Sequence, residues 1–186
     1  MLKFGSFGAK IMAIGLAFTL TALAADSNVD ASKSKITATF KQEGVAVKVP
    51  FLKFSGHIAY DPKNAAAATA AIDVVTGSLD LGDEGYNAEV RGKEWFDSDT
   101  YPTATFRSTA IKAGAAGKFD ATGKLTIKGK VLTITVPITV QPSAVGNIFD
   151  GSFVFSRSAF GVGNPSWKEI IDDKVTIHFH LVSTSK

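Results

Sequence analysis

Regular alternation of apolar and polar residues is the feature that most limits how this chain can fold. Every second residue from Val45 to Phe51 is apolar, and "VLTITVPITV" (131–140) repeats the spacing. On an extended strand this period places apolar side chains on one face and polar side chains on the other. The pattern recurs in about eight segments between Ile36 and Leu181, so the sequence predicts an all-β domain.

Helix signals are confined to one segment of the domain. In "YNAEVRGKEWF" we expect Asn87 to cap a short turn through Ala88, Glu89 and Val90, and Gly92 to end it. We therefore expect one or two short helices beside many antiparallel strands. A barrel is favoured over a sandwich because closure leaves no apolar strand edge unpaired.

The polar faces of the strands predict a barrel whose outer surface faces water. They carry many threonines together with charged residues, namely Lys35, Lys41, Lys48, Asp73 and Arg107. Most of the predicted strands are also shorter than the roughly ten residues that outer-membrane barrels use. The apolar faces are therefore expected to line the interior, which is either packed by side chains or filled by a ligand.

The first residues have the composition of a secretory signal peptide. Lys3 and Lys10 precede an apolar run of 13 residues (11–23), which is shorter than the roughly 20 residues of a membrane span. We expect this signal helix (1–24) to be removed by cleavage after Ala24, with Ala25 as the second choice. Export to the periplasm then leaves residues 25–186 as one domain. An uncleaved N-terminal anchor is the alternative.

Charge and cysteine content exclude several classes of function. The formal charge of +3 falls to +1 when Lys3 and Lys10 leave with the signal peptide, and the remaining charges are interspersed. Nucleic acid is therefore not an expected partner. The chain has no cysteine, which excludes disulfides, thiolate metal sites and cysteine nucleophiles.

His57 is the first candidate for chemistry, in the segment "FLKFSGHIAYDP". It alternates with Ile58 and Tyr60, so we expect it on the polar face of a strand, two positions before the turn that Asp61-Pro62 opens. Gly56 allows a bend or a bulge there, as at the corner of a barrel. We interpret this segment as a strand and a corner.

His178 and His180 are the second candidate, in "TIHFHLVS". Two positions apart on a strand, both imidazoles project from one face, a spacing that can serve a zinc or copper site. The apolar residues between them take the opposite face, which places both histidines on the solvent side. The chain has neither a serine-nucleophile motif nor a phosphate-binding loop. We therefore expect no enzyme and no bound metal, with a metal site at these histidines as the weaker alternative.

Five segments, in the same order along the chain, resemble those of the YceI-like family of bacterial exported proteins. They are "VDASKSKITATF", "FLKFSGHIAYDP", "WFDSDTYPTATFRST", "GKLTIKGKVLTITVPI" and "FSRSAFGVGNPSW". The resemblance covers about residues 28–182. It implies an eight-stranded antiparallel, lipocalin-like barrel, exported to the periplasm, whose apolar interior binds an isoprenoid chain, a quinone tail or a related long-chain lipid. It leaves open a homodimer and transient contact with a membrane.

The inward faces of the strands supply the hypothesis for a ligand-binding tunnel. Its proposed lining is Ile36, Phe40, Val47, Phe51, Phe106, Phe153 and Phe155. Three functions stay open: a lipid carrier or sensor, a periplasmic metal or redox-accessory protein that uses His178 and His180, and a structural barrel without a ligand. The lipid carrier is the one that the sequence favours.

Overall fold

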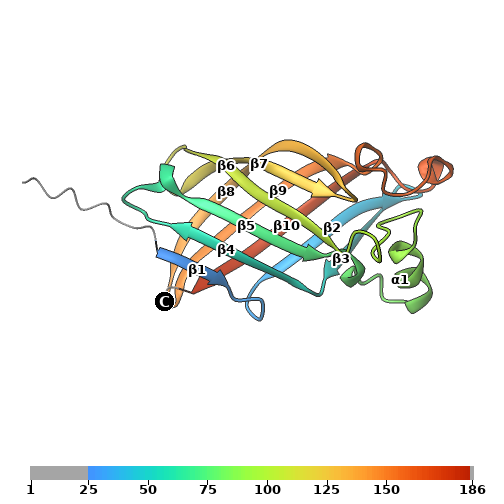
Figure 1. The fold of residues 1–186 in the computed structure, drawn as a ribbon, viewed down its shortest axis with the longest axis horizontal. Helices are drawn as coiled ribbons and strands as arrows, with labels where there is room; N and C mark the ends of the chain where they lie inside the picture. Colours follow the sequence, from blue (N-terminus) through green and yellow to red (C-terminus); the bar gives the residue numbers. More distant parts are fainter. Residues whose placement is uncertain (1–24, 185–186) are drawn as a thin grey trace, which may run out of the picture.

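The computed structural model describes residues 25–184, which form a closed β-barrel with the longest connections at one end (Figure 1). The predicted signal peptide and its cleavage after Ala24 lie outside the described residues. The strands are β1 (Ala25–Val29), β2 (Lys35–Gln42), β3 (Val45–Phe51), β4 (Phe54–Tyr60), β5 (Thr69–Val75), β6 (Thr103–Ala113), β7 (Lys118–Ile127), β8 (Lys130–Ser143), β9 (Gly146–Ser156) and β10 (Lys174–Thr184). The helices are η1 (Ala65–Ala67), η2 (Thr76–Ser78), α1 (Glu84–Arg91), η3 (Ser158–Phe160) and η4 (Pro165–Glu169).

Neighbouring strands are antiparallel throughout, and the sheet closes on itself. From β4 to β10 each strand pairs with the next one in the chain, and β10 then pairs with both β1 and β2. β1 and β2 follow each other along the same side of β10 and share one position in the barrel. β4 pairs with β1 and β3 pairs with β2, so β3 and β4 share the next position. The ten strands of the described residues therefore occupy eight positions around the barrel, which confirms the eight-stranded fold.

A polar turn at Asp30 separates β1 from β2. The Asp30 carboxylate accepts hydrogen bonds from the backbone N–H and the hydroxyl of Ser32, and Lys33 lies 3.0 Å from it. These contacts lower the pKa of Asp30 to about 2. The backbone N–H of Asp30 donates to the carbonyl oxygen of Val182 in β10, and the Val182 N–H donates to the Ser34 hydroxyl. The chain therefore stays attached to β10 across the interruption between β1 and β2.

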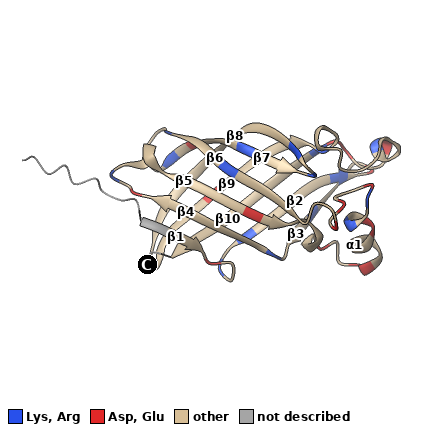
Figure 2. Ribbon diagram, in the orientation of Figure 1, with Lys and Arg blue, Asp and Glu red and all other residues tan. Residues whose placement is uncertain are grey.

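The two faces of the strands differ as the alternation predicts. Apolar residues of successive strands pack against one another inside the barrel in three adjoining clusters. Figure 2 shows charged residues along the strands and on the connections, and no charged residue of the described strands lines the interior. On the outside, for example, Arg107 of β6 bonds to Asp73 of β5 at 2.5 Å. None of the helices in the described part of the chain has the length and apolar character that crossing a membrane requires.

The predicted position of the helix is right, but the predicted N-cap residue, Asn87, is wrong. α1 begins at Glu84, and its N-cap is Asp83, whose side chain accepts a hydrogen bond from the backbone N–H of Tyr86. Asn87 lies inside the helix and uses its side-chain oxygen to accept from the backbone N–H of Leu81. The helix ends at Gly92 as predicted.

No bulge forms at Gly56, although glycine allows one there. β4 and β5 pair in unbroken register through Gly56. The register instead shifts in β6 between Ser108 and Ala110, which leaves Thr109 as the extra residue opposite β7. A bulge depends on the partner strand, so glycine alone did not locate it.

Three inward-facing glycines allow large side chains to lie flat across the inner wall. Ideal Cβ atoms built on Gly56, Gly123 and Gly151 would collide with Ile72, Phe106 and Phe179, respectively. At Gly151 the added carbon would also lie 2.6 Å from the carbonyl oxygen of Pro137, which is backbone and cannot rotate away.

We therefore expect Gly151→Ala to lower the free energy of unfolding by about 1–3 kcal/mol, the usual cost of overpacking a core. Chemical denaturation checks this. The control is Ser152→Ala, one residue further on the other face of β9, with a change of less than about 0.5 kcal/mol. Equal stability of Gly151→Ala and the wild type would show that Phe179 does not lie across this position.

Candidate functional site

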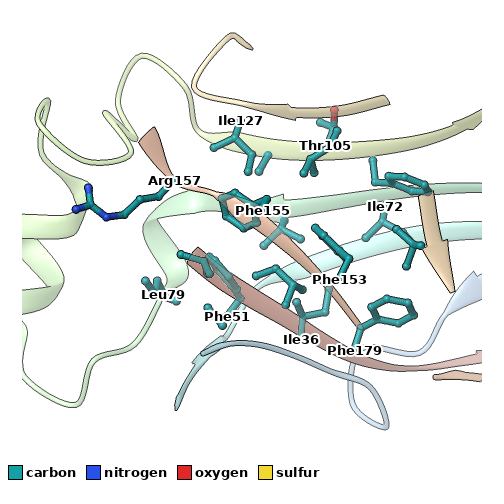
Figure 3. Close-up of a pocket in the computed structure, with 18 of the residues that line it drawn as sticks. Ile36, Phe51, Ile72, Leu79, Thr105, Ile127, Phe153, Phe155, Arg157 and Phe179 are labelled. Atoms are coloured by element: carbon teal, nitrogen blue, oxygen red, sulfur yellow. The ribbon is translucent and has the colours of Figure 1, made fainter. Parts of the chain in front are cut away.

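The barrel encloses a cavity of about 410 Å³. This volume falls within the roughly 300–1,000 Å³ of small-molecule sites in proteins. Side chains of every strand from β2 to β10 line it, and most of them are Ile, Val, Leu, Phe or Ala. Figure 3 shows Ile36, Phe51, Phe153 and Phe155 among the side chains that line this space. The cavity therefore suits a ligand that is mainly hydrocarbon.

All seven residues predicted for the tunnel line the cavity. They come from β2, β3, β6 and β9, and they are Ile36, Phe40, Val47, Phe51, Phe106, Phe153 and Phe155. Apart from the buried Ile36, they are only half-buried although they point inward. The interior is thus hollow rather than filled by its own side chains. Contact of these residues with a ligand stays a prediction.

Aromatic rings narrow the end of the cavity near the described chain termini, which we call the Tyr60 end. The Tyr60 ring packs edge-on against Phe119 and Phe149, with centroids 5.9 and 5.6 Å away. Burial raises the pKa of Tyr60, and the nearby Asp61 adds to the effect. The Tyr60 end is therefore largely apolar, with one phenol at its edge.

The connections 76–102 and 157–173 cover the opposite end, which we call the α1 end. Residues that sequence periodicity did not assign to the site enter the cavity here: Leu79, Leu81, Val90, Trp95, Phe96, Val162, Trp167 and Ile171. Four cavity-lining residues of the described chain are exposed, and three of them, Gln42, Tyr86 and Glu89, lie at the α1 end; the fourth is Thr69. Most of the exposed polar residues of the cavity lining therefore lie at the α1 end.

A buried arginine fastens the connection 157–173. Arg157 is 4% exposed, and its guanidinium donates to the backbone oxygens of Val162, Ile171 and Asp172 at 2.8–3.2 Å. The guanidinium carbon also lies 5.6 Å from the ring centroid of Trp95. These backbone oxygens accept hydrogen bonds from the guanidinium, whose charge would otherwise be costly to bury.

Asp173 holds the start of the same connection. Its carboxylate accepts hydrogen bonds from the Ser156 hydroxyl and from the backbone N–H of Ser158. Burial opposes ionisation of Asp173, but these hydrogen bonds and the charge of Arg157 together lower its pKa. The ionised form therefore stabilises the folded connection.

Trp95 carries an unpaired polar atom beside the cavity. The side chain is 7% exposed, and its indole ring packs against that of Trp167 with centroids 5.5 Å apart. Its Nε1 is the single buried side-chain nitrogen or oxygen without a hydrogen-bond partner in the described part of the chain. Buried donors of this kind are rare in folded proteins.

The histidines lie outside the cavity lining. His57 and His178 are exposed on the outer faces of β4 and β10, and His180 Nδ1 lies 2.7 Å from Asp150 Oδ1. The described residues contain no group of three or more metal-ligating side chains of the His, Cys, Asp or Glu type. The structure therefore brings His180 together with one carboxylate, but it does not assemble the closed ligand set of a structural metal site.

Comparisons with known proteins agree with this architecture. The family model described as a YceI-like domain matches residues 28–183. A UPF0312 protein of Vibrio cholerae is 32% identical over 143 residues, which cover 73% of this chain and 74% of the relative. The crystal structure of BcnA from Burkholderia cenocepacia is similar with a TM-score of 0.81 and 47% identity, covering 84% of this chain and 99% of BcnA. A structure described as a polyisoprenoid-binding domain from Saccharophagus degradans shares the fold, with a TM-score of 0.71 and 19% identity over 89% of this chain and 100% of that domain.

The lowered pKa of Asp173 predicts how stability depends on pH. Because the folded pKa lies below the unfolded value of about 4, the carboxylate stabilises the protein at neutral pH, and this contribution is lost as the pH falls through the folded pKa. We expect Asp173→Asn to lower the free energy of unfolding at neutral pH, and its difference from the wild type to shrink below about pH 4.

Urea unfolding at neutral and acidic pH measures both effects. The matched control is Asp172→Asn, because the neighbouring Asp172 is exposed and its side chain makes no hydrogen bond within the described residues. A difference between Asp173→Asn and the wild type that stayed constant with pH would contradict the assignment.

Proposed function

Because the chain belongs to the YceI-like family, we propose that it is an exported binding protein that holds a long isoprenoid or related lipid chain inside its barrel. The observation that carries this proposal is the hollow interior, lined from β2 to β10 mainly by hydrocarbon side chains. The proposed location is the periplasm, and it rests on the signal-like segment 1–24. The description of the related Saccharophagus fold as polyisoprenoid-binding is in line with such a ligand.

The energetics favour a carrier that takes lipid from another apolar environment. Burying about 40 carbons at ~0.8 kcal/mol each would give ~30 kcal/mol relative to water, beyond the roughly 18–21 kcal/mol of the tightest known complexes. A lipid in a membrane is already dry, so its transfer into the barrel changes the free energy little. The cavity then serves mainly to keep the chain out of water, and selection among lipids falls to shape and to a few polar atoms.

Two observations favour the carrier over the other functions that the sequence left open. A metal or redox-accessory role would use His178 and His180, but these side chains lie on the outer face, away from the cavity. A structural barrel would have a packed core, whereas inward-facing residues such as Phe106 and Phe153 are only half-buried. We infer binding rather than catalysis, with the lipid as the expected partner.

Lipid recovered from the native protein tests the proposal directly. Protein purified from the periplasm of its own host should carry an isoprenoid or another long-chain lipid in native mass spectrometry. Protein that carries no lipid, and that takes up none after mixing with lipid vesicles, would count decisively against the proposal.

Two variants connect the lipid to the cavity. Phe51→Asp places a charge in the apolar lining, and Ala70→Phe adds a ring there, so both should weaken lipid retention by more than about 10-fold. Ala71→Phe is the control for the second variant, because Ala71 follows Ala70 and takes the outer face of β5. Thermal unfolding shows whether each variant is folded. Retention at the wild-type level in a folded Ala70→Phe protein would place the lipid elsewhere.

A further inference from the structure

Two histidines lie next to each other on the outer face of β10, on the side of the strand that faces away from the cavity. His178 and His180 alternate with Ile177, Phe179 and Leu181, which line the cavity. At a rise of roughly 3.3 Å per residue, the Cα atoms of the two histidines are about 7 Å apart. A zinc or copper ion lies about 2 Å from an imidazole nitrogen, so both rings can reach one ion by leaning toward each other.

A carboxylate on the neighbouring strand orients one of the two rings. His180 Nδ1 lies 2.7 Å from Oδ1 of Asp150, its partner in β9. When Nδ1 carries the proton and donates it to this oxygen, the lone pair of the ring is on Nε2, which points away from Asp150. A carboxylate behind a metal-binding histidine fixes the ring in this way and makes the ligating nitrogen more basic. Asp150 therefore prepares His180 Nε2 for a metal ion.

His178 is available as the second ligand. It is exposed, and its side chain makes no hydrogen bond or ion pair within the described residues. Its partners across the sheet are Ser152 of β9 and Thr37 of β2, whose side chains are shorter than the imidazole. Neither neighbour therefore prevents the His178 ring from leaning toward His180.

Strand pairing on both sides fixes the spacing of the two ligands. β10 pairs with β9 along its whole length and with β2 from Thr176 to His180. Lys35 lies across from His180 on β2, and its charge opposes a bound cation. Lys35 is exposed, however, so its long side chain can hold the ammonium group in solvent, and the carboxylate of Asp150 on the other side supplies the opposite charge.

We propose that His178 and His180 form a surface site for a divalent transition-metal ion, with Asp150 as the positioning residue for His180. Two imidazoles suit Cu²⁺ and Zn²⁺, whereas Ca²⁺ and Mg²⁺ prefer oxygen ligands. Cu²⁺ should bind more tightly than Zn²⁺, following the general order of affinities of nitrogen ligands for these ions. Water molecules complete the coordination, so the site is open, in contrast to the closed ligand set of a structural zinc site.

This metal site is separate from the proposed lipid site. The ion lies outside the wall of the barrel and the lipid inside it, with the backbone of β10 between them. Metal binding is measured without lipid, so failure of the metal site leaves the proposed function untouched, and failure of lipid binding leaves the metal site untouched.

Titration of the purified protein, without a histidine tag, with Cu²⁺ tests the inference. His178→Ala and His180→Ala should each weaken Cu²⁺ binding by more than about 10-fold, because a change behind a ligand already costs about 10- to 100-fold and these variants remove the ligand itself. The matched control is His57→Ala, which removes the third histidine of the chain, on the outer face of β4, and should leave the affinity unchanged. Equal affinities in all three variants and the wild type would overturn the site.

Electron paramagnetic resonance of the Cu²⁺ complex separates the ligands from the positioning residue. The wild type should show two coordinated imidazole nitrogens, and each histidine variant should show one. Asp150→Asn should keep both nitrogens while binding Cu²⁺ about 10-fold more weakly, because the ligands remain and only the charge behind His180 is lost. One nitrogen in the wild type would contradict the pairing of the histidines, and an unchanged affinity of Asp150→Asn would contradict the role of Asp150.

Nuclear magnetic resonance with Zn²⁺ gives a readout on the unaltered protein. The ring signals of His178 and His180 should shift on addition of Zn²⁺, and that of His57 should not. Equal shifts of all three histidines, or a shift of none, would overturn the proposal.

Discussion

Closure of the sheet around an apolar face is the constraint on which the rest of this structure depends. Every strand has one face that must leave water, and β10 closes the barrel by pairing with β1 and β2 as well as with β9. Glycines such as Gly123 and Gly151 then let phenylalanine rings lie against the wall instead of meeting at the centre. The barrel is closed without being full. Its lining lacks the contacts that a packed core would provide, so a lipid that binds only the folded barrel would also stabilise it.

Polarity is distributed unevenly along the axis of the barrel. The strands supply hydrocarbon, whereas the connections at the α1 end supply a buried arginine, an ionised aspartate and an unpaired indole N–H. Arg157 and Asp173 hold the connection 157–173 in place. The buried arginine and the aspartate of this end thus stabilise the cover of the cavity.

The strand pattern made the part of the cavity lining that lies on strands predictable. The part that the connections contribute could not be predicted. Alternation of apolar and polar residues identifies the side chains that share a face of a strand, so residues such as Phe51 and Phe153 could be placed inside the barrel from the sequence. Trp95 and Trp167 lie in irregular connections, and only the tertiary fold brings them to the cavity. The capping error has a similar cause: Asp83 and Asn87 are both good helix caps, and the bond from Leu81 to Asn87 decides between them. The bulge at Thr109 depends on its register with β7, which one strand's sequence does not contain.

A cavity of this composition has limited means of telling one lipid from another. Contacts with isoprenoid methyl groups are individually weak and similar for many chains, so the walls set length and width more than identity. Polar groups in the lining change this, because an apolar surrounding makes an unmade hydrogen bond costly while leaving a made one unscreened. Discrimination then arises from the lipid that leaves a polar group of the lining unpaired as much as from the lipid that satisfies it. A barrel built mainly of hydrocarbon side chains can in this way be selective through the few polar groups that line its α1 end.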